Sequence, residues 1–337
     1  MRIRPRKRRR GFPSALGRAT STSFWAPEIR ETWLMHFFGD LEDILERDRP
    51  LAPLTTWRIG GPAEMFFSPR TPEETALLLR SLSERGLAFR VLGGGANVLL
   101  DDRPHGVPYI HPGRLTALRR EGDLWHVGAG IPFPRLVADA SREGWGGLEV
   151  LAGIPGQMGG ICRMNAGGRH GEIRDVVERV CMALPSGELR WFDAEEVGFA
   201  YRRTDLPPGV ITEVVLRLRW SPDPAALTQR MGEILKAKSA SQPLRTPSGG
   251  CVFANPEALS AGRLVEELGL KGRRRGGARI SPQHGNFIVN EGGASFEDVL
   301  GLIEEVEKQA LQRRGIRLRR EVSIWRAEPI RSDEDGV

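Results

Sequence analysis

Residues 148–168 read LEVLAGIPGQMGGICRMNAGG and hold six of the 41 glycines of the chain. The stretch separates a helical pattern from a strand-like pattern. Glycine lacks a Cβ and admits positive φ, so a backbone this poor in side chains can lie directly against a flat or anionic group. We interpret the stretch as a cofactor-binding loop.

A second glycine-rich stretch, VLGGGANVLL at residues 91–100, indicates that two loops share one ligand. Neither stretch matches a common nucleotide motif. The dinucleotide fingerprint G-x-G-x-x-G opens a helix, whereas Gly93–Asn97 runs into the apolar residues Val98–Leu100. A P-loop needs Gly-Lys-Ser/Thr after its glycines, which neither stretch supplies. Two ordinary glycine turns remain the alternative explanation.

The net charge of +6 is concentrated at the N-terminus of this 337-residue chain. Residues 1–34 hold nine of the 49 Lys and Arg and two of the 43 Asp and Glu, which leaves 40 basic and 41 acidic residues in the remainder. The remainder is long enough for two or three domains and has the composition of a globular protein. A nucleic-acid or membrane-surface role would therefore rest on the first residues alone.

The basic extension at residues 1–34 is expected to be disordered, because it is highly charged and low in aliphatic residues. We favour a mis-called start, with translation beginning at Met35; a nucleic-acid or membrane-binding arm is the alternative. Neither a secretory signal nor a membrane span is predicted. Cys162, Cys181 and Cys251 are odd in number and lack C-x-x-C spacing, which favours a reducing cytoplasm and predicts no metal site.

Local signals predict most of the helices. Thr71 as N-cap, Glu74 three residues later and Gly86 as the stop predict a helix between them. Further helices are predicted at 134–142, 223–240, from Ser260 and from Ser295, and a short one begins at Asp193. Strands are predicted within 87–95, 178–192 and 210–220.

The last predicted strand is IRLRREVSIW, residues 316–325. Strand alternation places Ile316, Leu318, Val322 and Ile324 on one face, and Glu321 on the other. If the apolar face meets a core, Glu321 points into a cleft or into solvent.

The motifs occur in one collinear order: TTWRIGGPAE, RVLGGGANVLL, GLEVLAGIPGQMGGICRMNAGG, FAYRRTD, QPLRTPSGGCVFANP, AGRLVEELGLKG, SPQHGNFIVN and LRREVSIW. Together they resemble the UDP-N-acetylenolpyruvoylglucosamine reductases, also called UDP-N-acetylmuramate dehydrogenases, over residues 51–325. Any one motif is weak, whereas the ordered series is a strong signal.

The resemblance implies an α+β fold: an FAD-binding module of the vanillyl-alcohol-oxidase (PCMH) type with a separate α+β substrate-binding domain. The expected division is 35–110 and 111–222 for the two FAD-binding subdomains, 223–326 for the substrate-binding domain with the C-terminal catalytic strand, and 327–337 for a polar tail. Only residues 221–241 separate the strand ending at Trp220 from the Gln242-Pro243 loop. The chain thus resembles the shorter form of the family, which lacks a substrate-covering insertion.

The resemblance also implies FAD as cofactor, with NADPH as co-substrate. Because no attachment residue can be assigned in the sequence, we expect the FAD to be bound non-covalently. The residues expected to lie on the flavin and its pyrophosphate are Arg58, Ile59, Gly60, Gly61, Gly93, Gly94, Gly95, Ala96, Asn97, Gly153, Ile154, Pro155, Gly156, Gly159, Gly160, Asn165 and Gly167.

The implied reaction reduces the enolpyruvyl ether of UDP-N-acetylglucosamine to UDP-N-acetylmuramate, for peptidoglycan synthesis. By motif match, Arg202 would hold the substrate carboxylate and the negative charge that develops beside it, with Glu321 next to it. Taken alone, Arg202 would more often be a surface ion-pair residue, and Glu321 a solvated carboxylate paired with a neighbouring arginine of its own strand.

Cys251 stands where the family usually has serine as the proton donor. A thiol with a pKa of about 8.5 is mostly protonated near neutral pH and is a better acid than an alcohol. A small buried hydrophobic residue is the alternative role for Cys251, and Ser248 lies nearby as a second donor.

The substrate-binding residues implied by the resemblance are Tyr201, Asn255 and, as a substitute for lysines that relatives carry, Lys238. The loop Lys271–Arg275 could meet the substrate phosphates, and Arg273–Arg275 could equally form a solvated turn. His284 is expected to be structural.

Two other functions remain open from the sequence. Another PCMH-type FAD oxidoreductase, acting on a hydroxy acid or alcohol, would not respond to the UDP-sugar. A nucleic-acid-binding protein would rest on the basic extension alone. For the preferred function we expect a cytoplasmic monomer that binds small molecules, with no nucleic acid bound by the folded body and no membrane span.

Overall fold

The computed structural model describes residues 39–257 and 259–328. The predicted extension at 1–34 and residues 329–337 of the predicted tail lie outside this range. Contacts divide the chain into residues 1–42 and 43–337, with the short helix η1 (Gly39–Ile44) at the division. The second unit holds all the other helices and strands described below.

The first sheet has the strand order β1-β2-β5-β3. Its strands are β1 (Leu45–Pro50), β2 (Pro62–Phe67), β5 (Tyr109–Ile110) and β3 (Arg90–Val91), with the short helix η2 (Ala52–Leu54) after β1. The predicted helix after Thr71 is confirmed as α2 (Pro72–Ser83), and the Thr71 side chain accepts a hydrogen bond from the Glu74 N–H. The strand predicted within 87–95 is reduced to two residues.

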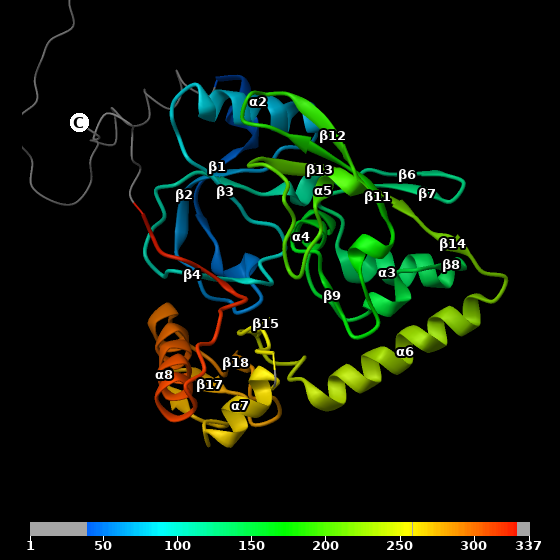
Figure 1. The fold of residues 1–337 in the computed structure, drawn as a ribbon. Coiled ribbons are helices and arrows are strands. Elements are labelled where there is room, and N and C mark those ends of the chain that lie inside the picture. Colours follow the sequence, from blue (N-terminus) through cyan, green and yellow to red (C-terminus); the bar gives the residue numbers. More distant parts are fainter. Residues whose placement is uncertain (1–38, 258, 329–337) are drawn as a thin grey trace, which may run out of the picture. The chain divides into compact units, whose positions relative to one another are not determined.

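The second sheet is antiparallel, in the order β12-β11-β13-β7-β6. Its strands are β6 (Leu118–Glu121), β7 (Leu124–Gly128), β11 (Val177–Ala183), β12 (Leu189–Asp193) and β13 (Val210–Arg217). Helices α3 (Phe133–Arg142) and α4 (Met158–Arg163) bury apolar side chains in the same core cluster as this sheet, and α2 contacts β11, β12 and β13. The main glycine-rich stretch thus includes α4 and packs on this sheet (Figure 1).

The third sheet has the order β15-β18-β17-β16. It consists of β15 (Ser248–Cys251), β16 (Arg274–Arg275), β17 (Ala278–Ile280) and β18 (Phe287–Asn290), and it shares a core with α7 (Ala261–Glu267) and α8 (Phe296–Arg314). Two residues from the first motif, Trp57 and Ile59, are buried in this core. The Trp57 indole donates to the Ile288 carbonyl at 2.8 Å, so this motif anchors the third sheet.

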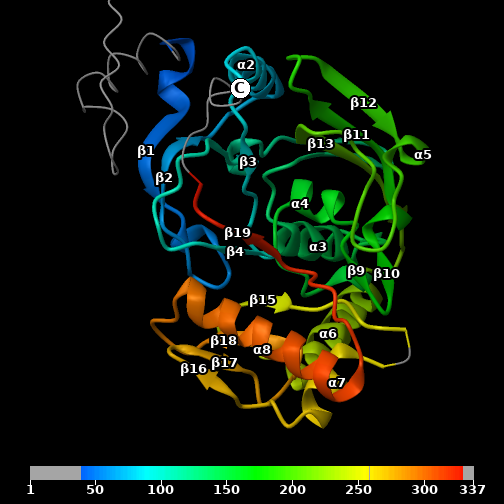
Figure 2. The same cartoon turned by 60° about the vertical axis from the view of Figure 1, so that its left-hand side comes forward.

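The C-terminal strand is shorter than predicted. Only Ser323–Trp325 forms a strand, β19, which pairs in parallel with β4 (Val98–Leu100). Figure 2 shows the two strands side by side. The predicted apolar face is nevertheless correct, because Ile316, Leu318, Val322 and Ile324 pack on the third-sheet core. Isolated backbone contacts, such as the bridge between Phe253 and Arg320, replace the ladder that a longer strand would form.

The remaining elements are short, apart from one long helix. They are η3 (Pro112–Arg114), β8 (Trp145–Gly146), η4 (Glu149–Leu151), β9 (Gly167–Gly168), β10 (Gly171–Glu172), η5 (Ile173–Asp175), α5 (Ala194–Val197), β14 (Arg219–Trp220) and the long helix α6 (Pro224–Ser241). Helix α6 packs on α3 and η4 and buries Ile234 in the core of the second sheet. Our division of the chain, which assigns α6 to the third domain, stays a proposal.

Candidate active site

An ion pair links two of the predicted catalytic residues. The Nε of Arg202 lies 2.7 Å from Oε1 of Glu321, and its Nη2 donates to the Gly167 carbonyl at 2.8 Å. The two side chains keep 21% and 14% of their surface exposed. The pair is therefore largely sheltered but still partly exposed to solvent.

The turn Ala200–Arg203 carries Arg202. Ala200 and Arg203 exchange two backbone hydrogen bonds of 3.0 and 3.2 Å, and Arg202 has a φ of +57°. This left-handed conformation is unfavourable for a residue with a Cβ, so the surrounding structure must hold it in place. The Tyr201 ring lies beside the pair, with its centroid 5.0 Å from Arg202 Cζ, and is 48% exposed.

The backbone of Glu321 joins three segments that are distant in sequence. Its N–H donates to the Val252 carbonyl at 2.8 Å, and its carbonyl accepts from Asn97 Nδ2 at 3.1 Å. The Asn97 carbonyl in turn accepts from the Ser323 N–H at 3.0 Å. The first glycine loop, the Cys251 strand and the C-terminal segment consequently meet at Glu321.

Cys251 is electrostatically coupled to the ion pair. Burial raises the pKa of its thiol to about 11, with a further increase from the Glu321 charge. Arg202 and a hydrogen bond with the Asn286 side chain act in the opposite direction. Because the pKa lies well above neutral, Cys251 carries its proton at pH 7. The three predicted catalytic residues are thus brought together.

The two glycine loops touch each other. A Cβ on Gly94 would lie 2.7 Å from the Gly156 Cα, so the close approach needs glycine. Next to this contact, Gln157 Oε1 is buried with no hydrogen-bond partner among the described residues. An unpaired buried acceptor costs about 1–3 kcal/mol, and a ligand with N–H or O–H donors would remove that cost. FAD has such donors, so these residues fit it.

Family profiles match two parts of the chain. One, described as an FAD binding domain, matches residues 63–193; the other, described as the C-terminal domain of UDP-N-acetylenolpyruvoylglucosamine reductase, matches residues 242–325. The reductase of Anaeromyxobacter dehalogenans is 43% identical over 86% of this chain and 88% of its own length. That of Carboxydothermus hydrogenoformans is 38% identical, over 83% of this chain and 93% of its own. The chain belongs to the UDP-N-acetylenolpyruvoylglucosamine reductase family.

A solved structure of the reductase family supports the same assignment. The crystal structure of UDP-N-acetylenolpyruvylglucosamine reductase from Thermus caldophilus matches with a TM-score of 0.73 and 41% identity. The match covers 83% of this chain and 98% of that one. The predicted family and the predicted α+β fold with a PCMH-type FAD-binding module are confirmed.

The expected flavin residues of this reductase-family chain divide by exposure. Those at least partly exposed are Arg58, Gly60, Gly93, Gly94, Ala96, Asn97, Gly153, Ile154, Pro155, Gly156, Gly160 and Gly167. Those buried within the chain are Ile59, Gly61, Gly95, Gly159 and Asn165. Ile59 lies in the core of the third sheet, and the Asn165 side chain bonds to other parts of the chain. These two side chains have structural contacts that the glycine pattern could not indicate.

The expected substrate-binding residues lie in different surroundings. Tyr201 is next to the ion pair, as described above. Lys238 Nζ donates to the carbonyl of Ala152, within the main glycine-rich stretch, at 2.6 Å, and burial lowers the pKa of Lys238. Asn255 is exposed, and its Oδ1 accepts from the Ala261 N–H at the start of α7. Lys238 and Asn255 therefore already have hydrogen-bond partners within the chain.

The basic segment Arg273–Arg275 is engaged by acidic residues. Arg273 pairs with Glu305 at 3.0 Å, and Arg274 pairs with Glu291. These partners favour the solvated-turn interpretation. His284 stacks edge-on against Phe287, and its Nδ1 accepts from the Asn286 N–H at 3.2 Å, which agrees with a structural role.

The sequence reasoning missed two polar residues at this site, Asn286 and Gln157. Asn286 is 3% exposed, exchanges hydrogen bonds of 2.9 and 2.8 Å with the Phe253 backbone and also bonds to Cys251. Both residues lie inside motifs that the resemblance already used. An amide within a glycine-rich loop, such as Gln157, is the signal that could have been followed.

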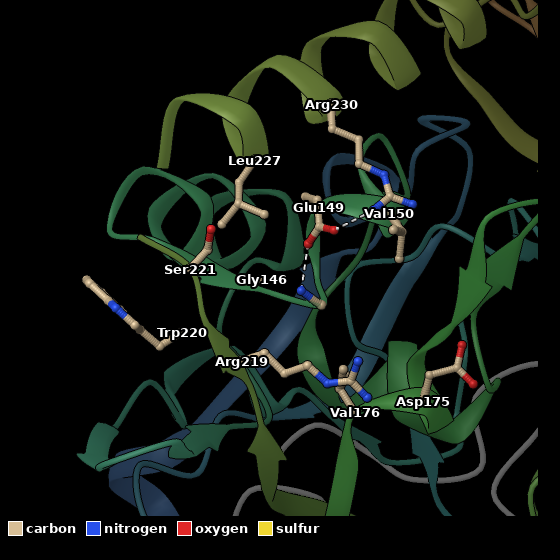
Figure 3. Close-up of a pocket in the computed structure, with 11 residues that line it drawn as sticks. Gly146, Glu149, Val150, Asp175, Val176, Arg219, Trp220, Ser221, Leu227 and Arg230 are labelled. Carbon is tan, nitrogen blue, oxygen red and sulfur yellow. Dashed lines mark hydrogen bonds and ion pairs between the residues drawn. The ribbon is translucent and has the colours of Figure 1, made fainter. Parts of the chain in front are cut away.

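A separate pocket of about 340 Å³ lies between α6, β14 and η4 (Figure 3). Its charged side chains include Arg219 and Arg230, of which Arg230 bonds to the buried Glu149 at 3.3 Å. None of the predicted site residues lines it.

In the described part of the chain no three His, Cys, Asp or Glu residues are grouped so that they could hold a metal ion. No helix in that part is long and apolar enough to cross a bilayer.

Proposed function

We propose that this reductase uses NADPH and a non-covalently bound FAD to convert the enolpyruvyl ether of UDP-N-acetylglucosamine to UDP-N-acetylmuramate, a peptidoglycan precursor. The observation that carries the proposal is the convergence of Arg202, Glu321 and Cys251. The three come from separate segments of the chain, and Asn97 of the first glycine loop bonds to the Glu321 backbone. A reaction at a flavin needs this proximity of cofactor loop and acid–base groups.

The glycine loops are proposed to hold FAD. The supporting features are the contact between Gly94 and Gly156 and the unpaired acceptor of Gln157. When bound, FAD supplies hydride transfer between NADPH and the enolpyruvyl group. The matched FAD-binding profile covers both loops. The exposed members of the expected flavin set remain our candidates for direct contact.

Arg202 is proposed to hold the substrate carboxylate and to stabilise the negative charge that develops on it. Its planar guanidinium can present two parallel N–H groups to a carboxylate. Donors already aimed by the Glu321 and Gly167 contacts need little reorganisation when the charge appears. Glu321 orients the guanidinium and, near the bound carboxylate, would share a proton.

Cys251 is proposed to deliver the proton from Sγ to the carbon next to the one that receives hydride. Its raised pKa keeps the thiol protonated at neutral pH, which a proton donor requires. The resulting thiolate would lie near the Arg202 cation, which favours the charged form. The exchange of serine for cysteine is therefore compatible with the same chemical role.

The remainder of the substrate is proposed to contact Tyr201, Asn255 and Lys238. Tyr201 supports this role by its exposure beside the ion pair. Lys238 would have to exchange its Ala152 carbonyl partner for a phosphate oxygen. We further propose that the protein is the shorter form of the family, with α6 in place of an insertion, and that it acts as a monomer in the cytoplasm.

Absorption spectroscopy under anaerobic conditions tests this function. The purified protein should show flavin absorption at about 450 nm, lose it with NADPH and regain it only when the enolpyruvyl UDP-sugar is added. A colourless protein that FAD does not reconstitute would contradict the proposal. A yellow protein that ignores the UDP-sugar would instead support a PCMH-type oxidase of a hydroxy acid or alcohol.

A further inference from the structure

Asn165 is buried within the chain, although the resemblance places it at the flavin. It follows α4, has a φ of +41°, and is 0% exposed. Its side-chain oxygen lies 3.4 Å from the Arg174 N–H, which donates to it. A fully buried amide with partners on both ends is fixed in orientation and offers no free surface to a cofactor.

The Asn165 amide nitrogen makes two further hydrogen bonds. Nδ2 donates to the Ala200 carbonyl at 3.0 Å and to Glu172 Oε2 at 2.9 Å. An amide has two N–H groups, and here both reach acceptors. An aspartate in this place would bring a carboxylate against another carboxylate and a carbonyl oxygen. This position therefore requires the two N–H donors of an asparagine side chain.

Ala200 is the first residue of the turn that carries Arg202. Asn165 thus holds the start of the strained turn, while Gly167, two residues further along, accepts from the Arg202 guanidinium at 2.8 Å. The first residue of the Arg202 turn and the tip of the Arg202 side chain are thus both attached to one three-residue segment, 165–167. A shift of this segment would move the guanidinium relative to Glu321.

We infer that Asn165 is a positioning residue for Arg202 and acts on the reaction through it. The inference rests on the proposed function, in which Arg202 binds the substrate carboxylate. Displacement of a reacting group by about 1 Å can cost on the order of 10²-fold in rate, so a single lost anchor can have a large effect. Flavin binding and flavin reduction by NADPH should not depend on this anchor.

The test measures two reactions separately in Asn165→Asp: the reduction of the flavin by NADPH, and the reoxidation of the flavin by the enolpyruvyl UDP-sugar. Flavin content and the rate of bleaching by NADPH should equal those of the unaltered protein, whereas reoxidation by the enolpyruvyl UDP-sugar should slow by on the order of 10²-fold. Asn165→Gly accepts the positive φ without strain and serves as the second variant if Asn165→Asp does not fold. Loss of flavin, or unchanged reoxidation, would overturn the inference.

Asn290→Asp is the matched control. Asn290 is also a buried amide, and its Nδ2 donates to the Trp57 carbonyl at 2.9 Å in the core of the third sheet. The Asn290→Asp variant should lose thermal stability as Asn165→Asp does. The folded Asn290→Asp protein should nevertheless keep the rate of flavin reoxidation by the UDP-sugar. Equal slowing in both variants would mean a general structural effect and would overturn the positioning role.

A double-mutant cycle with Arg202→Met separates the inference from the proposed function. If Asn165 acts through Arg202, Asn165→Asp should cause no further slowing in the Arg202→Met protein. Additive slowing would overturn the positioning role and leave the proposed function intact. Normal reoxidation in Arg202→Met alone would remove the proposed role of Arg202, and the positioning role with it.

Discussion

The guanidinium of Arg202 lies 2.7 Å from the Glu321 carboxylate, although 119 positions separate the two residues in the chain. Arg202 reaches this place from a strained turn anchored at Asn165, and Glu321 from a segment that pairs with β4. Cys251 is close enough for both charges to change its pKa. The candidate site is thus a product of tertiary structure, built from segments with no local relationship.

Replacing either residue of the Arg202–Glu321 ion pair should slow flavin reoxidation by the UDP-sugar and leave flavin reduction by NADPH unchanged. In Arg202→Met the N–H donors are lost, and the rate of flavin reoxidation by the UDP-sugar should fall by about 10²- to 10³-fold. Glu321→Gln should reduce the same rate, because it removes the charge that orients the guanidinium. Stopped-flow absorbance measures both rates, and flavin bleaching by NADPH should stay unchanged.

Arg203→Met is the neighbouring control for this pair. Arg203 shares the turn through its backbone hydrogen bonds, which the substitution leaves in place. Its reoxidation rate should remain close to that of the unaltered protein. If Arg203→Met were slowed as much as Arg202→Met, the carboxylate-binding role of Arg202 would be wrong.

Cys251 should be replaceable by serine but not by alanine. Cys251→Ala removes the proton donor, and steady-state turnover should fall by on the order of 10²- to 10⁴-fold. Cys251→Ser restores a hydroxyl and should keep most of the turnover. The check is turnover with NADPH and the UDP-sugar, together with flavin bleaching as a control for folding. Full activity in Cys251→Ala would exclude this residue and direct attention to Ser248.

The pH dependence of flavin reoxidation should follow the protonation of the Cys251 thiol. A donor must be protonated, and the pKa of Cys251 is raised to about 11, so the reoxidation rate should stay level across the neutral and mildly alkaline range and decline only as pH approaches that value. Single-turnover rates between pH 7 and about 10.5 test this expectation. A decline centred near 8.5, the ordinary pKa of a cysteine, would show that burial does not protect the thiol in solution.

Alkaline pH should also reduce stability through Cys162. Burial raises the pKa of this thiol to about 12, whereas in the unfolded chain it is about 8.5. A group with a raised folded-state pKa contributes fully below its unfolded pKa, and that contribution is lost as pH rises toward the folded pKa. Urea unfolding at pH 7, 9 and 10 should therefore show a decline that is weaker in Cys162→Ala. An identical slope in both proteins would contradict this assignment.

Gly94→Ala should weaken FAD binding. The added Cβ would meet the Gly156 backbone at 2.7 Å, so the two loops must move apart, and overpacking of this kind costs about 1–3 kcal/mol. The measurement is the flavin-to-protein ratio after purification and the Kd for added FAD. Gly232→Ala, in α6, is the control and should retain its flavin, because the new Cβ would meet no atom within 4 Å beyond its chain neighbours and the backbone of its own helix. Equal flavin content in both variants would contradict the shared-ligand interpretation of the loops.

Local sequence signals predicted the helices well. Thr71, Asp223 and Ser295 all accept hydrogen bonds from the first turn of the helix that follows, as their positions indicated. Capping depends on residues three positions apart, so the sequence alone contains the information. The prediction of one long strand at 316–325 was wrong because a strand depends on a partner that is distant in sequence. The alternation of apolar residues is present, but only residues 323–325 pair with another strand, β4.

Ordered motifs and side-chain chemistry are properties of the chain, so the family, the class of fold and the residue types of the candidate site could all be predicted from the sequence. Which atoms meet could not, because this depends on how the chain packs. The tertiary structure buried Ile59 and Asn165, brought Gly94 against Gly156, and placed the Cys251 thiol where burial raises its pKa. Contacts and desolvation depend on the distances between segments far apart in the chain, and those distances are fixed only when the sheets pack.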